Sequence, residues 1–115
     1  MSVYVDDMRA PFGRMIMCHM IADTDAELHA MADRIGVARR WHQAPPRHDS
    51  HYDIALSARA KAVAAGAAEI TQRQCGVMVL HRRRTGILPN PDQVPEIMRE
   101  LHERMRAASM EHPNA

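Results

Sequence analysis

The pair His51 and Asp53 is the pattern in this sequence with the most direct chemical potential. In an extended backbone, side chains two positions apart point to the same side, so this imidazole and carboxylate would lie together. Such a pair can hold a metal ion, or the carboxylate of Asp53 can orient His51 as a general base. The preceding residues 47–49, Arg-His-Asp, follow two prolines and are equally consistent with a solvated loop.

A second histidine, His19, lies within the short apolar run of residues 14–21. It can be a core residue that is hydrogen-bonded to a backbone carbonyl. It can instead stand at a strand end, beside the loop that leads through Thr24 into a helix. Because the free N–H groups and the dipole of a helix N-terminus favour a phosphate group, Thr24 is a candidate ligand-binding residue and His19 a candidate catalytic one.

Two adjacent acids, Asp6 and Asp7, follow a short β-branched and aromatic run at residues 3–5. Ligands of open α/β sheets bind beyond the carboxyl ends of the strands, where these acids are expected. Their oxygens are suitable ligands for a divalent cation. The alternative is a solvated junction between a strand and a loop.

The remaining histidine of interest, His29, flanks the apolar face of a predicted helix rather than filling it. It is either part of a solvated face with weak ion pairs or a catalytic residue that lines a cleft beside the sheet.

An arginine beside an aromatic ring provides the pattern most typical of nucleotide binding. In an extended segment, Arg40 and His42 would share one face and Trp41 would lie on the other. A guanidinium group can grip a phosphate, and an indole ring can stack on a base. Arg59, near the start of a later predicted helix, could add a second phosphate contact. For Trp41 the alternative is a plain core anchor.

One helix that must position these residues has clear boundaries in the sequence. Thr24 and Glu27 form a capping box, and Gly36 can supply a left-handed C-terminal cap. Between them, Leu28, Met31, Ala32 and Ile35 repeat at helical spacing. The pattern predicts a helix over residues 25–35.

The other elements are predicted from shorter patterns. A helix is predicted from Ser57, as N-cap, to a stop at Gly66. Residues 72–84 fit both a helix and a strand, and the capping pattern of Thr71 with Gln74 favours the helix. Residues 10–13 are predicted to form a turn, and strands are predicted at residues 3–5, 14–21, 37–42 and 67–70.

Together these elements predict a small single-domain α/β protein with a short sheet of three to four strands and two or three helices. We expect residues 1–86 to form the compact domain. Residues 87–115 should form a linker and a C-terminal amphipathic helix, with Asn90 as N-cap. That helix would pack on the domain or on a partner, including a second copy of the chain in a homo-oligomer.

The segments YVDD, CHMIADT, ELHAMADRIG, RRWHQ and HYDIALSARAKAVAAGAAEI occur in an order that resembles domain-of-unknown-function family 4031, a family of small bacterial and phage proteins. The resemblance covers roughly residues 3–75 and includes His51, Tyr52 and Asp53. It implies a small α/β domain with a polar site. In some relatives the domain accompanies a phosphohydrolase-type domain, which suggests nucleotide or phosphate chemistry.

Composition excludes several other classes of protein. The chain of 115 residues has a formal net charge of +1, so no bulk charge draws it to nucleic acid. The basic run at residues 81–86 is expected to be a solvated helix end, with a nucleic-acid patch as the alternative. No signal peptide and no apolar run long enough to span a membrane are recognised. The two cysteines do not form a metal-binding or disulfide pattern, and a cytoplasmic location is expected.

Three hypotheses for function follow. In the first, His19, His29, His51, Asp53 and Arg40 converge on one cleft that binds a small phosphorylated or nucleotide ligand and hydrolyses or transfers a phosphate-type group. A divalent metal is possible there, although no particular cofactor is indicated. In the second, the same cleft sequesters a nucleotide without catalysis, as a small phage protein would. In the third, the chain is a protein-interaction module that acts through its last helix.

Overall fold

The computed structural model describes residues 2–111, and its centre is a five-stranded sheet built around one long strand. The strands are β1 (Val3–Val5), β2 (Ala10–Phe12), β3 (Met15–Ala22), β4 (Tyr52–Ala55) and β5 (Ala68–Glu69). β3 pairs antiparallel with β1 and β2 along one edge and with β4 along the other, while β1 also pairs parallel with β5. The sheet therefore brings β1 and β4, far apart in the sequence, to the two sides of β3.

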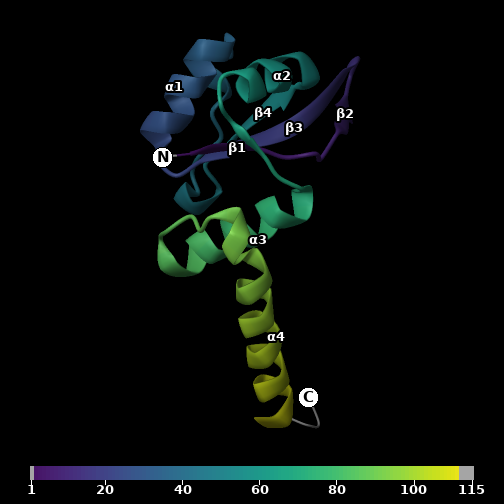
Figure 1. Cartoon of the computed structure of the whole chain (residues 1–115), viewed down its shortest axis with the longest axis vertical. Coiled ribbons are helices and arrows are strands. Elements are labelled where there is room, and N and C mark those ends of the chain that lie inside the picture. Colours follow the sequence, from purple (N-terminus) through teal and green to yellow (C-terminus); the bar gives the residue numbers. More distant parts are fainter. Residues whose placement is uncertain (1, 112–115) are drawn as a thin grey trace.

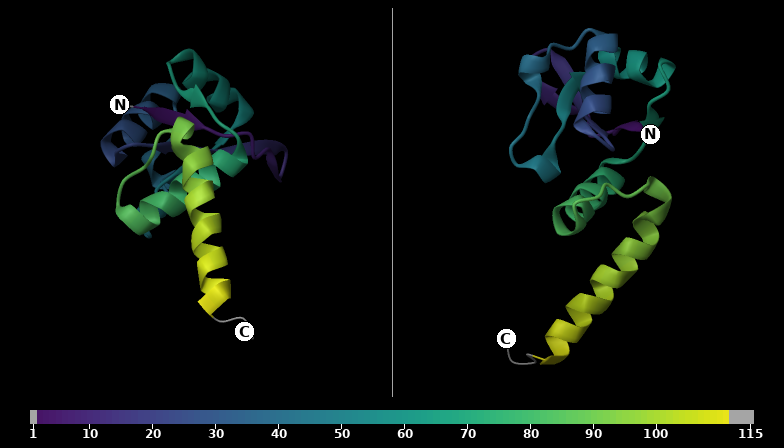
Figure 2. Two further views of the ribbon diagram at one scale, coloured as in Figure 1. Left: turned by 60° about the horizontal axis from the view of Figure 1, so that its bottom comes forward. Right: turned by 90° about the vertical axis from the view of Figure 1, so that its left-hand side faces the viewer.

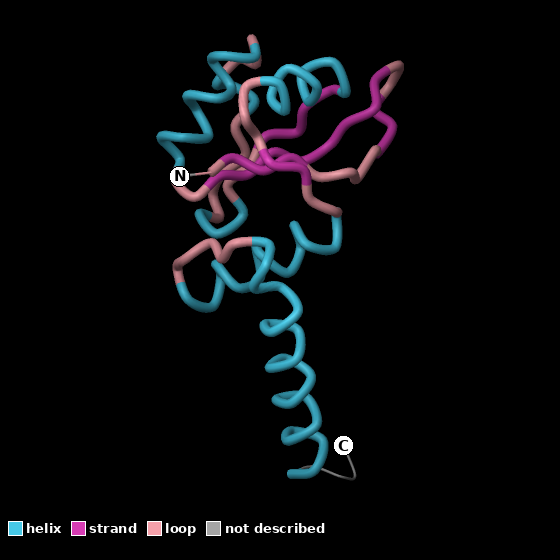
Figure 3. The backbone as a smooth tube through the Cα atoms, in the orientation of Figure 1, coloured by secondary structure: helices cyan, strands magenta, loops and turns pink. Residues whose placement is uncertain are grey.

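Helices cover both faces of this sheet. They are α1 (Asp25–Ile35), α2 (Leu56–Ala64), α3 (Gln72–Thr85) and α4 (Val94–Glu111). α1 and α2 lie over one face, which we call the α1/α2 face, and α3 lies over the other, the α3 face (Figures 1 and 3). The predicted small α/β fold with a C-terminal helix is confirmed, with one more strand than expected.

Side chains of the sheet alternate between two apolar cores. Val5, Met20 and Tyr52 pack in the core of the α1/α2 face. Tyr4 and Ile21, one position away on the same strands, pack with Cys75, Met78 and other residues of the α3 face. Because successive strand residues point to opposite faces, the residues next to Val5, Met20 and Tyr52 are directed toward α3.

The helix predicted over residues 25–35 is confirmed at both ends. The Thr24 hydroxyl accepts a hydrogen bond from the Glu27 N–H at 3.2 Å, and Gly36 adopts the left-handed conformation with φ of 78°. The ambiguous residues 72–84 form α3, whose capping box joins Thr71 and Gln74 in both directions. These hydrogen bonds between side chains and backbone N–H groups favour the start of a helix here, although the apolar run also fits a strand.

Three local predictions were wrong. Residues 37–42 contain the 3-10 helix η1 (Arg39–Trp41) instead of a strand, and Trp41 is 59% exposed. The expected turn at residues 10–13 is largely β2, and the chain reverses one step later, at Gly13, with φ of 59°. Ser57 is not an N-cap, because α2 begins at Leu56 and has no side-chain cap.

The C-terminal helix departs from the body of the molecule. Asn90 caps the 3-10 helix η3 (Pro91–Gln93), which leads into α4. Val94 and Ile97, in the first turns of α4, are buried, whereas Met105 is 69% exposed. The rest of the helix extends away from the sheet in every view, which gives the chain extents of 52 × 31 × 25 Å (Figures 1 and 2). Among the described residues, none of the helices combines the length and apolar character needed to cross a membrane.

Candidate active site

Three polar side chains form a row across three adjacent strands on the α3 face. His19 of β3 is the register partner of Asp53 of β4. Asp6 directly follows β1 and donates its backbone N–H to the His19 carbonyl at 3.0 Å, so it flanks His19 from the other side. The order of the row is therefore Asp6, His19, Asp53, and the strand pairing alone places an imidazole between two carboxylates.

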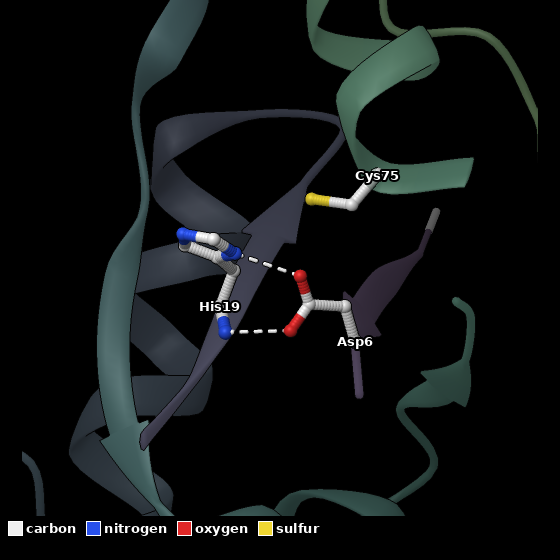
Figure 4. A group of neighbouring side chains, drawn as sticks. All are labelled: Asp6, His19 and Cys75. Atoms are coloured by element: carbon white, nitrogen blue, oxygen red, sulfur yellow. Dashed lines mark hydrogen bonds and ion pairs between the residues drawn. The ribbon is translucent and has the colours of Figure 1, made fainter. Parts of the chain in front are cut away.

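The contact between Asp6 and His19 is the most constrained part of the row. His19 Nδ1 lies 2.7 Å from Asp6 Oδ2, and the His19 N–H donates to Asp6 Oδ1 at 2.8 Å (Figure 4). The Met8 N–H donates to the same Oδ1 at 3.1 Å. Asp6 is completely buried. A carboxylate buried at this depth needs such donors, and these hydrogen bonds hold the ring of His19 in one orientation.

The contact between Asp6 and His19 shifts the pKa of both residues. Burial by itself raises the pKa of Asp6, but the hydrogen bonds from the His19 ring and from the backbone outweigh it, so the pKa of Asp6 is lowered. The hydrogen bond that the His19 ring donates to Asp6 raises the pKa of His19, against an opposing contribution from burial. Asp6 is therefore an ionised acceptor, and His19 Nδ1 carries the proton between them.

The other end of the row contains a carboxylate oxygen without a hydrogen bond. Asp53 Oδ1 lies 3.8 Å from His19 Nε2 and 3.5 Å from His51 Nε2. This oxygen is buried, and within residues 2–111 no donor reaches it. The second oxygen, Oδ2, accepts a hydrogen bond from Gln43 Nε2 at 2.8 Å. His51 Nδ1 lies 2.6 Å from the Asp49 carbonyl oxygen.

A small pocket opens beside these atoms. It has a volume of about 290 Å³, at the lower end of the usual range for ligand pockets. Its polar side is formed by His19 and His51, and its other walls come from β3, η2 (Arg47–Asp49) and α3. The lining residues are His19, Ile21, Asp49, His51, Gln72, Cys75, Gly76 and Val79.

Cys75 reaches this region from α3. Its sulfur points toward Asp6 and the His19 ring (Figure 4), and the three groups form one cluster of possible metal ligands. Burial, followed by the nearby charge of Asp6, raises the pKa of the Cys75 thiol to about 12. The sulfur is therefore an uncharged thiol and not a nucleophile. Asp6 already accepts three hydrogen bonds, which leaves it little capacity for a cation.

The histidines expected to complete a single cleft lie elsewhere. His29 Nδ1 is 2.7 Å from the Tyr52 hydroxyl, and His42 Nε2 is 2.7 Å from the Ser50 hydroxyl, which donates to Asp25 Oδ1 at 2.6 Å. Tyr52 belongs to the core of the α1/α2 face. His29 and His42 are thus separated by the sheet from His19 and His51, and the hypothesis of a single cleft is corrected to two clusters on opposite faces.

The predicted phosphate-binding arginine also lies outside the pocket. The guanidinium carbon of Arg40 lies 5.1 Å from the centre of the Trp41 ring, a cation–π contact made by the exposed η1 segment. Neither side chain lines the pocket beside His19.

Arg59, Thr24 and Asp7 have contacts within the fold. Arg59 donates from Nε to the Asp6 carbonyl oxygen and from NH1 to Glu69. Thr24 caps α1, and Asp7 Oδ1 accepts from the Gln72 N–H at the start of α3. Arg59 and Asp7 thus anchor one element to another, Thr24 caps its own helix, and none of the three lines the pocket beside His19.

Several residues of the site were not expected from the sequence. Gln43, Asp49 and Cys75 lie far from His19 along the chain, and no local pattern links them to it. Arg82 was assigned to a solvated helix end, yet it donates to the carbonyl oxygens of Ala22, His48 and Ser50. These bonds hold α3 against the loop that carries Asp49. Two parts of the site had a signal in the sequence: the acid Asp6 directly after the first strand, and the pair His51 and Asp53 at a spacing of two.

Comparison with known proteins gives one match. A family model described as "Protein of unknown function (DUF4031)" matches residues 3–83. The matched range contains the whole row, His51 and the pocket wall from α3, and it stops before α4. No curated protein and no solved structure matches the chain.

Proposed function

The chain belongs to the DUF4031 family of proteins of unknown function, and we propose that its α3-face pocket binds a small phosphorylated or nucleotide ligand and hydrolyses it. The observation that carries the proposal is that His19 Nε2 and His51 Nε2 face one buried carboxylate oxygen of Asp53, while the two histidines themselves line the pocket. Constrained histidines and carboxylates of this kind transfer protons or bind a cation that activates water.

The size and charge of the pocket restrict the ligand. A volume of about 290 Å³ accommodates a small group, such as a phosphate with part of its leaving group, rather than a whole dinucleotide. No arginine or lysine lines the pocket as described. The negative charge of a phosphate must therefore be balanced by protonated imidazoles or by a bound cation.

A screen of nucleotides and sugar phosphates by thermal shift, with and without divalent cations, tests the proposal. A ligand at 100 times its dissociation constant should stabilise the protein by about 2.7 kcal/mol. Release of phosphate from the identified ligand should fall by at least about 100-fold in His51→Ala. His29→Ala, a histidine on the opposite face, is the matched control and should retain activity.

The alternative is a binding protein without catalysis. It predicts that the ligand binds the same pocket and is recovered intact from the complex after prolonged incubation. Loss of binding in His51→Ala without any turnover in the native protein would establish this alternative and contradict the hydrolase. If alanine at His19 and His51 leaves binding unchanged, both functions of the pocket fail.

For α4 we propose contact with a second copy of the chain. Val94 packs with Cys75 and Met78 of α3 and Ile97 is also buried, but Met105 continues the same apolar stripe with 69% of its surface exposed. Light scattering after size-exclusion chromatography should show a dimer, and Met105→Glu should convert it to a monomer. The cytoplasm is the compartment we propose, because both cysteines are buried free thiols.

A further inference from the structure

Asp53 Oδ1 is a buried carboxylate oxygen that faces two imidazole nitrogens, an arrangement that a bound cation would stabilise. We propose that His19 Nε2, His51 Nε2 and Asp53 Oδ1 bind a divalent transition-metal ion, with zinc as the best fit. All three atoms lie within 4.8 Å of one another. The ion would serve the proposed hydrolysis, but its site is defined by these three side chains whether or not a substrate is turned over.

The tautomers of the two histidines direct lone pairs toward the same point. His51 Nδ1 faces the Asp49 carbonyl oxygen, which can only accept, so Nδ1 carries the hydrogen. His19 Nδ1 faces the Asp6 carboxylate and is likewise the donor. In the neutral imidazoles, both Nε2 atoms are therefore unprotonated acceptors. Together with Asp53 Oδ1, three acceptors then face one another without a donor, which is unfavourable unless a proton or a metal cation lies between them.

The distances fit ligands of a metal better than hydrogen bonds. Asp53 Oδ1 lies 3.5 Å from His51 Nε2 and 3.8 Å from His19 Nε2. A proton shared between an imidazole and a carboxylate would bring N and O to about 2.7–2.9 Å. Two ligands at about 2.05 Å from a tetrahedral zinc ion are about 3.3 Å apart. The observed separations exceed the first value clearly and approach the second.

Each ligand is also held from behind, as metal ligands in proteins usually are. The Asp6 carboxylate orients His19, the Asp49 carbonyl orients His51, and the Gln43 amide binds Asp53 Oδ2 and leaves Oδ1 free. Aspartate–histidine–metal arrangements of this type fix the ring orientation and increase the basicity of the ligand nitrogen. Each of the three proposed ligand atoms therefore belongs to a side chain that a separate hydrogen bond already holds in place.

The donor set selects the class of ion. Two imidazoles and one carboxylate suit zinc and similar transition metals, whereas magnesium and calcium prefer oxygen ligands throughout. Three protein ligands leave one tetrahedral position open, as in catalytic zinc sites. Because His19 and His51 line the pocket, that position is accessible to a water molecule or a phosphate oxygen there. The ion would supply the positive charge that the pocket walls lack.

Metal binding can be measured directly on the full-length protein. After treatment with a chelator, zinc is titrated by calorimetry in competition with a chromophoric chelator, and magnesium is titrated separately. We expect one zinc per chain and no comparable magnesium binding. Cobalt(II) in place of zinc should give the strong visible absorption of a four-coordinate ion, a readout that is independent of activity.

Variants assign the ion to the proposed atoms. His51→Ala and the nearly isosteric Asp53→Asn should abolish stoichiometric zinc binding and the cobalt spectrum. Asp6→Asn, which replaces the carboxylate behind His19 with an amide, should weaken zinc binding by roughly 10–100-fold. His29→Ala, on the α1/α2 face, should leave both measurements unchanged. Circular dichroism of each variant checks that the fold is retained.

Some results would overturn the proposal. These are the absence of stoichiometric zinc in the native protein, unchanged zinc binding in the folded Asp53→Asn variant, or an equal loss in His29→Ala. The outcome is separable from that of the proposed function. Zinc binding without turnover of any phosphate ester supports the metal site and contradicts the hydrolase. Turnover that persists in the chelated protein supports the hydrolase and contradicts a role for the ion in it.

Discussion

The two faces of the sheet carry similar polar residues, but these are hydrogen-bonded to one another on the α1/α2 face and only partly so on the α3 face. On the α1/α2 face, Ser50 donates to Asp25 and is bonded to His42, and His29 is bonded to Tyr52. On the α3 face, His19 and His51 direct Nε2 atoms toward a carboxylate oxygen that no described donor reaches. Histidine and aspartate are present on both faces, so residue type alone does not distinguish a structural cluster from a functional one.

The difference lies in the match between donors and acceptors. Hydroxyl groups on the α1/α2 face can both donate and accept, so a chain of hydrogen bonds can close there. The α3 face offers acceptors around one point without such a hydroxyl. A network in which every donor has an acceptor contributes to the stability of the fold. A group of acceptors without a donor lowers that stability and leaves the acceptors free to bind a ligand. The predictions below test this contrast.

The largest contrast is expected between neighbouring residues of β4 that point to opposite faces. Tyr52 is completely buried, so Tyr52→Ala should lower the free energy of unfolding by about 3–5 kcal/mol. Asp53→Ala should change it by less than about 1 kcal/mol, because it removes a carboxylate whose Oδ1 makes no hydrogen bond to the described residues. Urea unfolding measures both, and equal losses would contradict the division into structural and functional faces.

A smaller loss is expected in the closed network itself. Ser50 is 1% exposed, and Ser50→Ala leaves Asp25 and His42 without their shared partner. The free energy of unfolding should fall by about 1–3 kcal/mol. Ser57→Ala is the matched control, since Ser57 is exposed at the start of α2, and its effect should stay within about 0.5 kcal/mol. Zinc binding should be retained in both variants.

A gain rather than a loss is predicted on the α3 face. In Asp53→Asn the amide oxygen can keep the bond from Gln43, while the amide N–H groups face the two Nε2 acceptors. The metal-free protein should be as stable as the native chain or more stable by up to about 1 kcal/mol. Thermal unfolding in the presence of a chelator measures this change. A loss above about 2 kcal/mol would show that Asp53 has a structural role.

The smallest effect concerns pH and His42. Burial, followed by the neighbouring His29, lowers the pKa of His42, against the opposing charge of Asp25. An imidazole with a lowered folded-state pKa is protonated more readily when unfolded, so its contribution to stability is present above about pH 6.5 and is lost as the pH falls. Replacing His42 with glutamine should therefore reduce the decline in stability between about pH 7 and pH 5. An unchanged decline would contradict this assignment.

Much of the fold was predictable because local signals determined it. The capping contacts of Thr24 and of Thr71 with Gln74 set the starts of α1 and α3. The errors occurred where pairing with a distant strand or packing at the surface determines the secondary structure. β2 is a three-residue strand held by β3, with Phe12 68% exposed, and no local periodicity distinguishes it from a turn.

The site was predictable only in part. The alternation of an extended chain is enough to place His51 and Asp53 on one side, and their side chains do lie on one face. The contact of Asp6 with His19 depends on the register between β1 and β3, and the pocket wall depends on how α3 packs. The sequence could not show that the sheet separates His29 from His51, because that depends on which face α1 covers.

The alternation of Tyr52 and Asp53 along β4 also acts as a check on folding errors. If β4 paired with β3 one residue out of register, every side chain of the strand would change face. The carboxylate would then enter an apolar core, and the tyrosine would leave it. A mispaired chain would lose its core and its polar row together, so a stable molecule with a half-assembled site is not an available product. Core packing thus favours the native register of β4, and the same register sets Asp53 opposite His19.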